Sequence, residues 1–207
     1  MKVLLTGCAG FIGSHTCEKL LSKGFSVIGI DNFSTFYDRR IKEKNLDQFL
    51  NHPNFTFKEL DIRDHEALKN ELKDQVDLVV HLAAKAGVRP SILNPRDYID
   101  VNIKGTQNLL QWMVDINCKK LFYASSSSVY GNNKNGQAVK EGHFDLQPIS
   151  PYAFTKRSGE LMNYTYHHLY NFDVINARFF TVYGPRQRPD LAIHKFVDLI
   201  SKGQPIH

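Results

Sequence analysis

The stretch Thr6-Gly7-Cys8-Ala9-Gly10-Phe11-Ile12-Gly13 follows the apolar run Val3-Leu4-Leu5 and precedes a helical pattern over residues 14–23. This order predicts a strand, a glycine-rich turn and a helix start. Three glycines at GxxGxxG spacing allow a tight turn, a close approach of the backbone to a pyrophosphate, and close packing of the helix on its strand. The helix N-terminus then offers free N–H groups and the positive end of a dipole to a phosphate.

A second apolar run, residues 27–30, ends in Asp31. An acid at the end of the second strand of such a unit accepts hydrogen bonds from the adenosine ribose of a dinucleotide. With strand, turn, helix, strand and acid in this order, the sequence predicts dinucleotide binding. The glycine motif by itself would leave open a tight turn that binds nothing.

The composition is that of an ordinary globular protein, with 42% hydrophobic and 23% charged side chains. The net charge is +5, but the basic residues form no stripe and have no aromatic platform beside them, which argues against nucleic-acid binding. Cys8, Cys17 and Cys118 lack CxxC spacing, so we expect reduced thiols, no disulfide framework and no metal site. The first apolar run is too short for a cleavable leader, and no run reaches the length of a membrane span, which predicts a cytoplasmic protein without membrane contact.

Apolar runs of β type alternate with helical patterns along the chain, which predicts an α/β fold: a doubly wound parallel sheet with helices on both faces. Ser150 and Pro151 supply an N-cap and a first-turn proline for one of the helices. Residues 131–142 read as a glycine- and asparagine-rich loop, and the abrupt end after a helix suggests a fragment of a longer protein. Further strands are expected at 55–57, 77–84, 121–124 and 172–178, and helices at 41–50, 65–72, 97–116, 152–169 and 192–202.

Three chemically competent side chains are expected at the carboxyl edge of the sheet, where the ligands of open parallel sheets collect. Ser126 follows the fifth strand, while Tyr152 and Lys156 are four residues apart and share one helix face. A lysine ammonium and a positively charged nicotinamide would favour the phenolate and lower the phenol pKa, and the serine hydroxyl could relay the proton. Together they predict interconversion of an alcohol and a ketone; the alternative is a packing tyrosine, a solvated lysine and a capping serine.

These stretches resemble the extended short-chain dehydrogenase/reductase superfamily, in its branch of NAD-dependent nucleotide-sugar epimerases and dehydratases. The resemblance covers nearly the whole chain, and residues 84–89 and 180–190 are most similar to UDP-glucuronate 4-epimerases. The matching motifs are TGCAGFIG, Asp31, Asp61-Ile62, His81-Leu82-Ala83-Ala84, Asn102 with Gly105-Thr106, Ser125-Ser126-Ser127, Pro151 to Lys156, and Arg178 to Pro185.

The resemblance implies a role for each matched residue. Tyr152 would be the base, Lys156 its electrostatic partner and ribose anchor, and Ser126 the hydroxyl relay. The UDP-sugar substrate would meet Arg89, Ser126, Ser127, Thr181 and Arg188. The cofactor NAD would contact Gly7, Gly10, Phe11, Ile12 and Gly13 with its pyrophosphate, Asp31 and Asn32 with its adenosine ribose, Asp61 and Ile62 with its adenine, and further Leu82, Ala83, Ala84, Asn102, Tyr152 and Lys156.

The implied reaction is epimerisation at C4 through a transient 4-keto sugar. Dehydratases and decarboxylases of this branch usually carry an acid within two residues after the catalytic hydroxyl, where this chain has Ser127 and Ser128. A UDP-glucose-type epimerase, a dehydratase and a non-catalytic NAD-binding protein stay as alternatives. Asp31 disfavours NADP because a carboxylate repels its 2′-phosphate, although Arg39 and Arg40 leave some room for it.

By the same resemblance, residues 1–207 would be an NAD-binding Rossmann domain with the start of a substrate-binding region at about 178–207, and a smaller C-terminal domain would be missing. The helices predicted at 97–116 and 152–169 would form the contact of a homodimer, with Trp112 and Tyr166 at its seam. A helix face buried within the chain would show the same apolar period.

Overall fold

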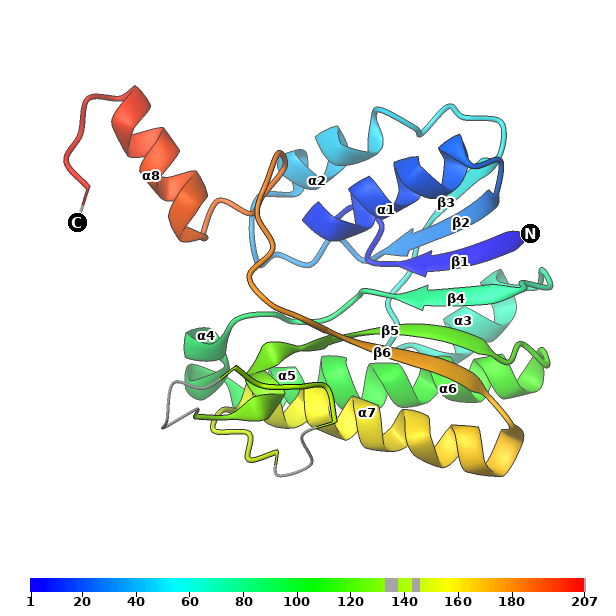
Figure 1. Cartoon of the computed structure of the whole chain (residues 1–207). Helices are drawn as coiled ribbons and strands as arrows, with labels where there is room; N and C mark the ends of the chain where they lie inside the picture. Colours follow the sequence, from blue (N-terminus) through cyan, green and yellow to red (C-terminus); the bar gives the residue numbers. More distant parts are fainter. Residues whose placement is uncertain (133–137, 143–145, 207) are drawn as a thin grey trace.

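The computed structural model describes residues 1–132, 138–142 and 146–206, so part of the predicted loop at 131–142 lies outside the described residues. A six-stranded parallel sheet in the order β3-β2-β1-β4-β5-β6 forms its centre (Figure 1). The strand order reverses between β1 and β4, which leaves a crevice at the carboxyl ends of these strands. The strands are β1 (Lys2–Thr6), β2 (Ser26–Asp31), β3 (Phe55–Glu59), β4 (Leu78–His81), β5 (Lys120–Ser126) and β6 (Asp173–Phe179).

Two apolar cores form because successive side chains of a strand point to opposite faces of the sheet. Val3 and Leu5 of β1 pack with α1 (Phe11–Ser22) and α2 (Arg39–Leu46). Leu4, between them, faces α3 (His65–Glu71), α6 (Gly105–Asp115) and α7 (Pro151–Tyr170). Helices therefore cover both faces, which confirms the predicted doubly wound fold.

The helix α7 begins where its sequence predicts. The Ser150 hydroxyl accepts a hydrogen bond from the Ala153 N–H at 3.1 Å, and Pro151 occupies the first turn, where its missing N–H costs nothing. The helix ends at Tyr170, and its C-cap residue Asn171 has a left-handed φ of 57°, a conformation that asparagine tolerates better than most residues. The catalytic candidates Tyr152 and Lys156 thus lie on the first two turns of a firmly capped helix.

The long helix predicted at 97–116 is divided into three parts. It consists of α5 (Pro95–Ile99), a π-helical turn (Asp100–Lys104) and α6, and a further short helix, α4 (Val88–Leu93), precedes it unpredicted. A 3₁₀ turn over Ser127–Tyr130 follows β5. The last helix, α8 (Ala192–Ser201), stands apart from the sheet in Figure 1 and buries none of its residues.

Trp112 and Tyr166 do not lie at an outer seam. Trp112 is 1% exposed and Tyr166 7% exposed, and both belong to the core between the sheet and its helices. The apolar period of α6 and α7 comes from their inward faces, so the prediction that these two residues line a dimer contact is wrong.

All three cysteines are buried. Burial raises the pKa of each thiol, that of Cys17 to about 12, and none of them forms a disulfide. Because the thiolate is the reactive form, these cysteines are chemically inert side chains of the core.

Candidate active site

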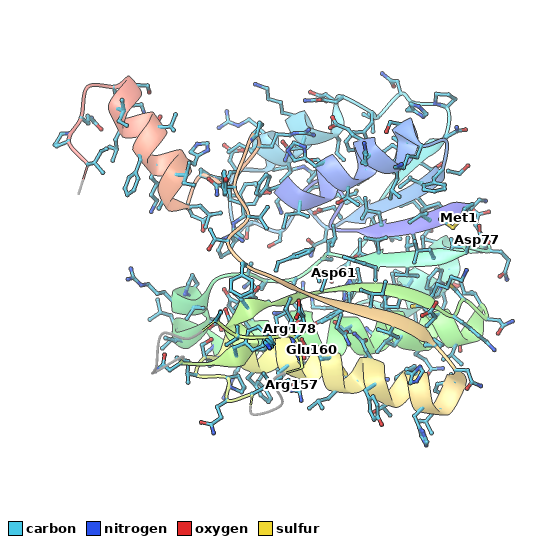
Figure 2. The ribbon with its side chains drawn as sticks, in the orientation of Figure 1. Met1, Asp61, Asp77, Arg157, Glu160 and Arg178 are labelled. Carbon is cyan, nitrogen blue, oxygen red and sulfur yellow. The ribbon has the colours of Figure 1, made fainter. Side chains whose placement is uncertain are left out.

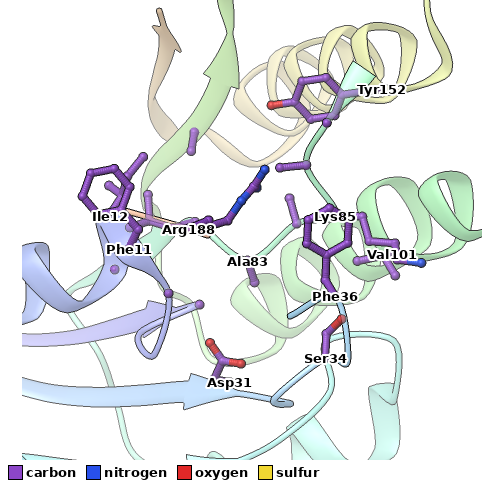
Figure 3. Close-up of a pocket in the computed structure, with 18 of the residues that line it drawn as sticks. Phe11, Ile12, Asp31, Ser34, Phe36, Ala83, Lys85, Val101, Tyr152 and Arg188 are labelled. Carbon is purple, nitrogen blue, oxygen red and sulfur yellow. The ribbon is translucent and has the colours of Figure 1, made fainter. Parts of the chain in front are cut away.

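A cavity of about 1040 Å³ opens at the carboxyl edge of the sheet, between the loops that follow the strands. In Figure 3, Tyr152 and Asp31 lie at opposite ends of it, and Arg188 reaches into the space between them. Every site residue predicted from the sequence lines this cavity except Arg89 and Asn102. The structure therefore brings together segments from residue 7 to residue 188.

The glycine-rich turn needs its glycines for two different reasons. Gly7 has a φ of +73°, and a Cβ at that position would lie 2.9 Å from the Ala83 nitrogen. A Cβ on Gly13 would lie 1.9 Å from the Gly7 carbonyl oxygen, so α1 could not start so close to its strand. Helix α1 begins at Phe11, its N-cap residue Gly10 has no side chain to cap it, and its first N–H groups are left for a ligand in the cavity.

Asp31 closes the other end of the cavity. Its carboxylate, 8% exposed, accepts hydrogen bonds from the N–H groups of Phe33 at 2.9 Å and Ala9 at 3.2 Å, with the Lys42 Nζ at 3.9 Å. Burial raises the pKa of Asp31, while Lys42 and the two N–H groups pull it down. Asp61 stands beside it on the next strand end and accepts a hydrogen bond from the Asn32 amide at 2.8 Å.

Arg39 and Arg40, the two arginines that could have met the 2′-phosphate of NADP, each form ion pairs with carboxylates of the chain. Arg39 binds both oxygens of Glu59 at 2.9 and 2.8 Å and also Glu43, and Arg40 binds Asp38 at 2.6 Å. Both guanidinium groups hold carboxylates at the surface, and the preference for NAD over NADP continues to rest on Asp31.

A buried chain of hydrogen bonds holds the loop after β4. The Ala83 N–H donates to the Thr6 hydroxyl at 3.0 Å, which lies 2.7 Å from His81 Nδ1. On the other side, His81 Nε2 lies 3.0 Å from the Thr106 hydroxyl, which donates to the Asn102 carbonyl at 2.7 Å. Since Thr106 donates its proton to that carbonyl, Nε2 must donate, and the Thr6 hydroxyl, which accepts from Ala83, has its own proton left to donate to Nδ1, so a neutral His81 ring satisfies every partner in the chain.

We expect His81 to make the protein sensitive to acid. Burial, helped by the charge of Lys156, lowers the pKa of His81 from 6.5 to about 3. Between these values the unfolded chain binds a proton that the folded chain does not, so the contribution of His81 to the free energy of unfolding falls as pH drops, by about 1.4 kcal/mol per pH unit. Chemical denaturation at pH 7, 6, 5 and 4 measures this slope.

The control for this prediction is an exposed histidine. His81→Asn should lower stability at pH 7 and flatten the slope below pH 6.5, whereas His168→Asn on the surface of α7 should leave the slope as in the wild type. Parallel slopes for the wild type and His81→Asn would contradict the assignment.

The candidate catalytic residues meet where β5 ends beside α7. Burial raises the pKa of the Tyr152 phenol, and a hydrogen bond with Ser126 and the charge of Arg188 oppose this rise. The Lys156 ammonium donates to the Ala124 carbonyl at 2.6 Å, and burial lowers its pKa to about 8. Burial thus has the largest effect on the phenol pKa, and the expectation that Lys156 together with a nicotinamide favours the phenolate stays a prediction.

Ser126 and Tyr152 are each held from a second side. The Ser126 hydroxyl accepts a hydrogen bond from the Ser128 N–H at 3.2 Å, and the Tyr152 ring packs edge-on against Tyr98 at 6.3 Å between centroids. The Tyr98 hydroxyl in turn donates to the Ala86 carbonyl at 2.9 Å. The reactive oxygens therefore project from side chains with fixed positions.

Glu160 ties α7 to the last two strands directly behind these residues (Figure 2). Its carboxylate is 3% exposed and accepts hydrogen bonds from Ser125 at 2.6 Å, from Arg178 at 2.9 and 3.0 Å, and from Arg157 at 2.9 Å. Burial raises the pKa of Glu160, but these bonds outweigh it and hold the pKa below its ordinary value. Sequence reasoning missed Glu160 because its partners come from three separate elements.

Arg188 is the cation best placed to meet an anionic ligand. Its side chain is 18% exposed, binds both oxygens of Asp190 at 3.0 and 2.9 Å, and lies 5.0 Å from the centroid of the Phe36 ring. Thr181 also lines the cavity. Phe36 was not predicted as a site residue, since it lies in a polar, turn-like stretch without a motif.

Two predicted residues are placed differently. Arg89 is exposed on α4, and the chain turns there through Gly87 with a φ of +110°, so Arg89 does not line the cavity. Asn102 is buried, and its side-chain amide accepts a hydrogen bond from the Lys85 N–H at 2.8 Å and donates one to the Lys85 carbonyl at 3.0 Å. Asn102 therefore fixes the loop, and it is Lys85, which pairs with Asp97 at 2.5 Å, that lines the cavity.

No helix among the described residues is long and apolar enough to cross a membrane. In the same part of the chain, histidine, cysteine, aspartate and glutamate side chains form no group of three or more that could hold a metal ion.

A family model described as GDP-mannose 4,6 dehydratase matches residues 4–205. Protein CapI of Staphylococcus aureus is 47% identical over all of the chain, and the UDP-glucuronate 4-epimerase of Thermodesulfobacterium geofontis is 46% identical over 98% of it. The crystal structure of a UDP-glucuronic acid 4-epimerase from Bacillus cereus, in complex with UDP-glucuronic acid and NAD, is 38% identical over 99% of the chain, with a TM-score of 0.89. The chain spans 61% and 62% of the length of the two relatives and 64% of the crystallised chain.

Proposed function

The chain belongs to the GDP-mannose 4,6-dehydratase family, and from this premise we propose that it is the cofactor-binding part of an NAD-dependent UDP-glucuronate 4-epimerase. The observation that carries the proposal is one cavity in which Ser126, Tyr152 and Lys156 share the space with Arg188 and the glycine-rich turn. The family match over residues 4–205 confirms the family predicted from the sequence. The similar proteins that are named UDP-glucuronate 4-epimerases support the proposed reaction.

The residues present fit NAD. The uncapped start of α1 suits a pyrophosphate, and the close approach of Gly7 to Ala83 leaves no space for a side chain there. Asp31 would accept from the adenosine ribose, and Asp61 with Ile62 would border the adenine. Bound NAD would supply a hydride acceptor and donor.

The chain's own residues would handle the proton. Tyr152 would take the proton of the sugar C4 hydroxyl, and Ser126, in hydrogen-bond contact with the phenol, would hold the C4 oxygen. Lys156 would keep a positive charge close to the phenolate as it forms. Because the hydroxyl is restored with the opposite configuration, the net reaction is an isomerisation.

We expect Arg188 to discriminate an acidic sugar from a neutral one. Arg188→Ala should raise KM for UDP-glucuronate by about 10- to 100-fold, the loss of a charge-assisted bond worth about 1.5–3 kcal/mol, and should change KM for UDP-glucose by less than threefold. Steady-state kinetics with both substrates measure the difference. Equal effects on the two substrates would remove the carboxylate from the proposal and favour a UDP-glucose-type epimerase.

A dehydratase is the weaker enzymatic alternative. Elimination needs an acid close to the catalytic hydroxyl, and Ser127 and Ser128 occupy those positions, with Ser128 bonded to Ser126. A non-catalytic NAD-binding protein is the alternative of another class, and only an activity measurement separates it from the epimerase.

A homodimer is a further part of the proposal. The outer face of α7 carries Phe154, Leu161 and Tyr164, exposed by 47%, 53% and 69%, and apolar side chains in a row suit a contact between copies. Sedimentation with and without Leu161→Glu tests the dimer.

We also propose that residues 178–207 begin a substrate-binding region. The protein is further proposed to be cytoplasmic, since its thiols are free.

The experiment that tests the proposed function is a turnover assay with UDP-glucuronate and UDP-galacturonate. It is run on the 207-residue chain and on any longer product of its gene, with bound NAD quantified in both. Interconversion of the two sugars supports the proposal. Bound NAD without turnover in either form would leave the cofactor site standing and favour another sugar or the non-catalytic alternative.

A further inference from the structure

Arg186 connects the loop after β6 with helix α1. Its Nη2 donates to Glu18 Oε2 at 2.6 Å and lies 2.9 Å from His15 Nδ1. His15 Nε2 in turn lies 2.9 Å from the Pro185 carbonyl oxygen, so the ring accepts from the arginine and donates back to the loop. In Figure 1 the orange segment that leaves β6 rises beside the start of α1 before it reaches α8.

The turn itself gives no reason for an arginine at this position. Arg186 has a φ of +65°, a left-handed conformation that glycine or asparagine adopts with less strain. Its Nη1 is buried and finds no hydrogen-bond partner among the described residues. Both features cost stability, and such costs persist where the surrounding contacts serve another purpose.

The contacts of Arg186 join two segments that line the cavity. Two residues later in the loop, Arg188 reaches into the cavity, and Phe11 at the start of α1 lines it as well. His15 packs edge-on against Phe11 with 5.8 Å between ring centroids. The helix that would bind the pyrophosphate is thus bonded to the loop that carries the substrate cation.

We infer that Arg186, with Glu18 and His15, is a latch that holds the loop against α1, which makes Arg186 a positioning residue for Arg188. The identity of the ligand that Arg188 meets rests on the proposed function; the latch rests on the contacts alone. The side chain of Arg186 is outside the cavity lining, so it acts through the loop.

The variant that separates a latch from a turn residue is Arg186→Asn. Asparagine tolerates the left-handed conformation, so a residue needed only for the turn would leave Tm and kinetics unchanged or improved. A latch predicts an unchanged Tm and unchanged bound NAD, a KM for UDP-glucuronate at least tenfold higher, and a kcat within twofold of the wild type. It also predicts at least tenfold faster amide exchange over residues 184–191, where the Gln187 and Leu191 N–H groups bond within the loop.

Two further variants sharpen the test. Glu18→Ala should also raise KM for UDP-glucuronate and speed amide exchange over residues 184–191. The double variant should add little to Arg186→Asn, since both substitutions remove the same contact between Arg186 and Glu18. Arg40→Gln, which removes an exposed arginine paired with Asp38, should change neither readout. The kinetics and the exchange are measured on the longest form that the gene encodes.

Each outcome decides a different point. Unchanged exchange in Arg186→Asn would overturn the latch, and faster exchange with an unchanged KM would overturn its positioning role. If the wild type does not turn over UDP-glucuronate while Arg186→Asn speeds exchange, the proposed function fails and the latch stands.

Discussion

Tyr152→Phe is expected to lower kcat for the epimerisation of UDP-glucuronate by about 10²- to 10⁴-fold, the usual contribution of a positioned general base. The change removes one oxygen and keeps the ring, which packs against Tyr98 in the wall of the cavity. Bound NAD, KM and Tm should therefore stay close to the wild-type values. Single-turnover and steady-state assays with the purified variant measure the loss.

A second tyrosine on the same helix provides the control. Tyr164 is 69% exposed, and Tyr164→Phe should retain full activity. If Tyr152→Phe kept more than a tenth of the wild-type kcat, the phenol would not be the base, and Ser126 or Lys156 would have to take its place in the mechanism.

Glu160→Ala is expected to lower the free energy of unfolding by about 3–5 kcal/mol, the cost of breaking a buried ion pair by removing one partner. The loss follows because Arg178, bonded twice to Glu160, would keep its charge in a site built for a carboxylate. Arg157 is partly exposed and can turn to water, which places the expected value toward the lower end of that range. Urea denaturation followed by circular dichroism measures it.

The matched control is an acid in an exposed pair. Glu43 is bonded to Arg39 on the surface of α2, and Glu43→Ala should cost less than about 1 kcal/mol. A loss in Glu160→Ala no greater than in Glu43→Ala would show that the cluster behind the active site adds nothing to stability.

Local patterns were sufficient to predict most of the fold. The strand, turn and helix around Gly7 to Gly13 follow from steric needs within a few residues, and so does the start of α7 at Ser150 and Pro151. The parallel sheet follows from the alternation of elements, since such units have one favoured handedness. For the same reason Ser126, Tyr152 and Lys156 could be placed at one edge from sequence alone.

Periodicity shows which helix face is apolar and leaves open what covers it. Trp112 and Tyr166 were predicted at an outer seam, but they pack inside the chain. The π-helical turn at 100–104 interrupts a helix whose apolar spacing looks continuous in the sequence. The first difference comes from packing of these helices inside the chain, and the second lies where the π-helical turn packs against α7.

Contacts between distant segments were the part that sequence could not supply. Glu160 meets Arg178, and Arg186 meets Glu18, through pairings that no local spacing encodes. Arg89 followed a motif match and yet lies on the exposed side of α4. The residues that support the site are therefore less predictable than those that line it.

The burial of Cys8, Cys17 and Cys118 has a practical consequence for spectroscopy. With no reactive thiol at the surface, a maleimide dye would label only cysteines introduced on purpose. His194→Cys on α8 and Lys23→Cys at the end of α1 would place a fluorophore pair on exposed positions without altering the core. Energy transfer between the two would then report whether the distance between α8 and α1 changes when nucleotide or sugar is added.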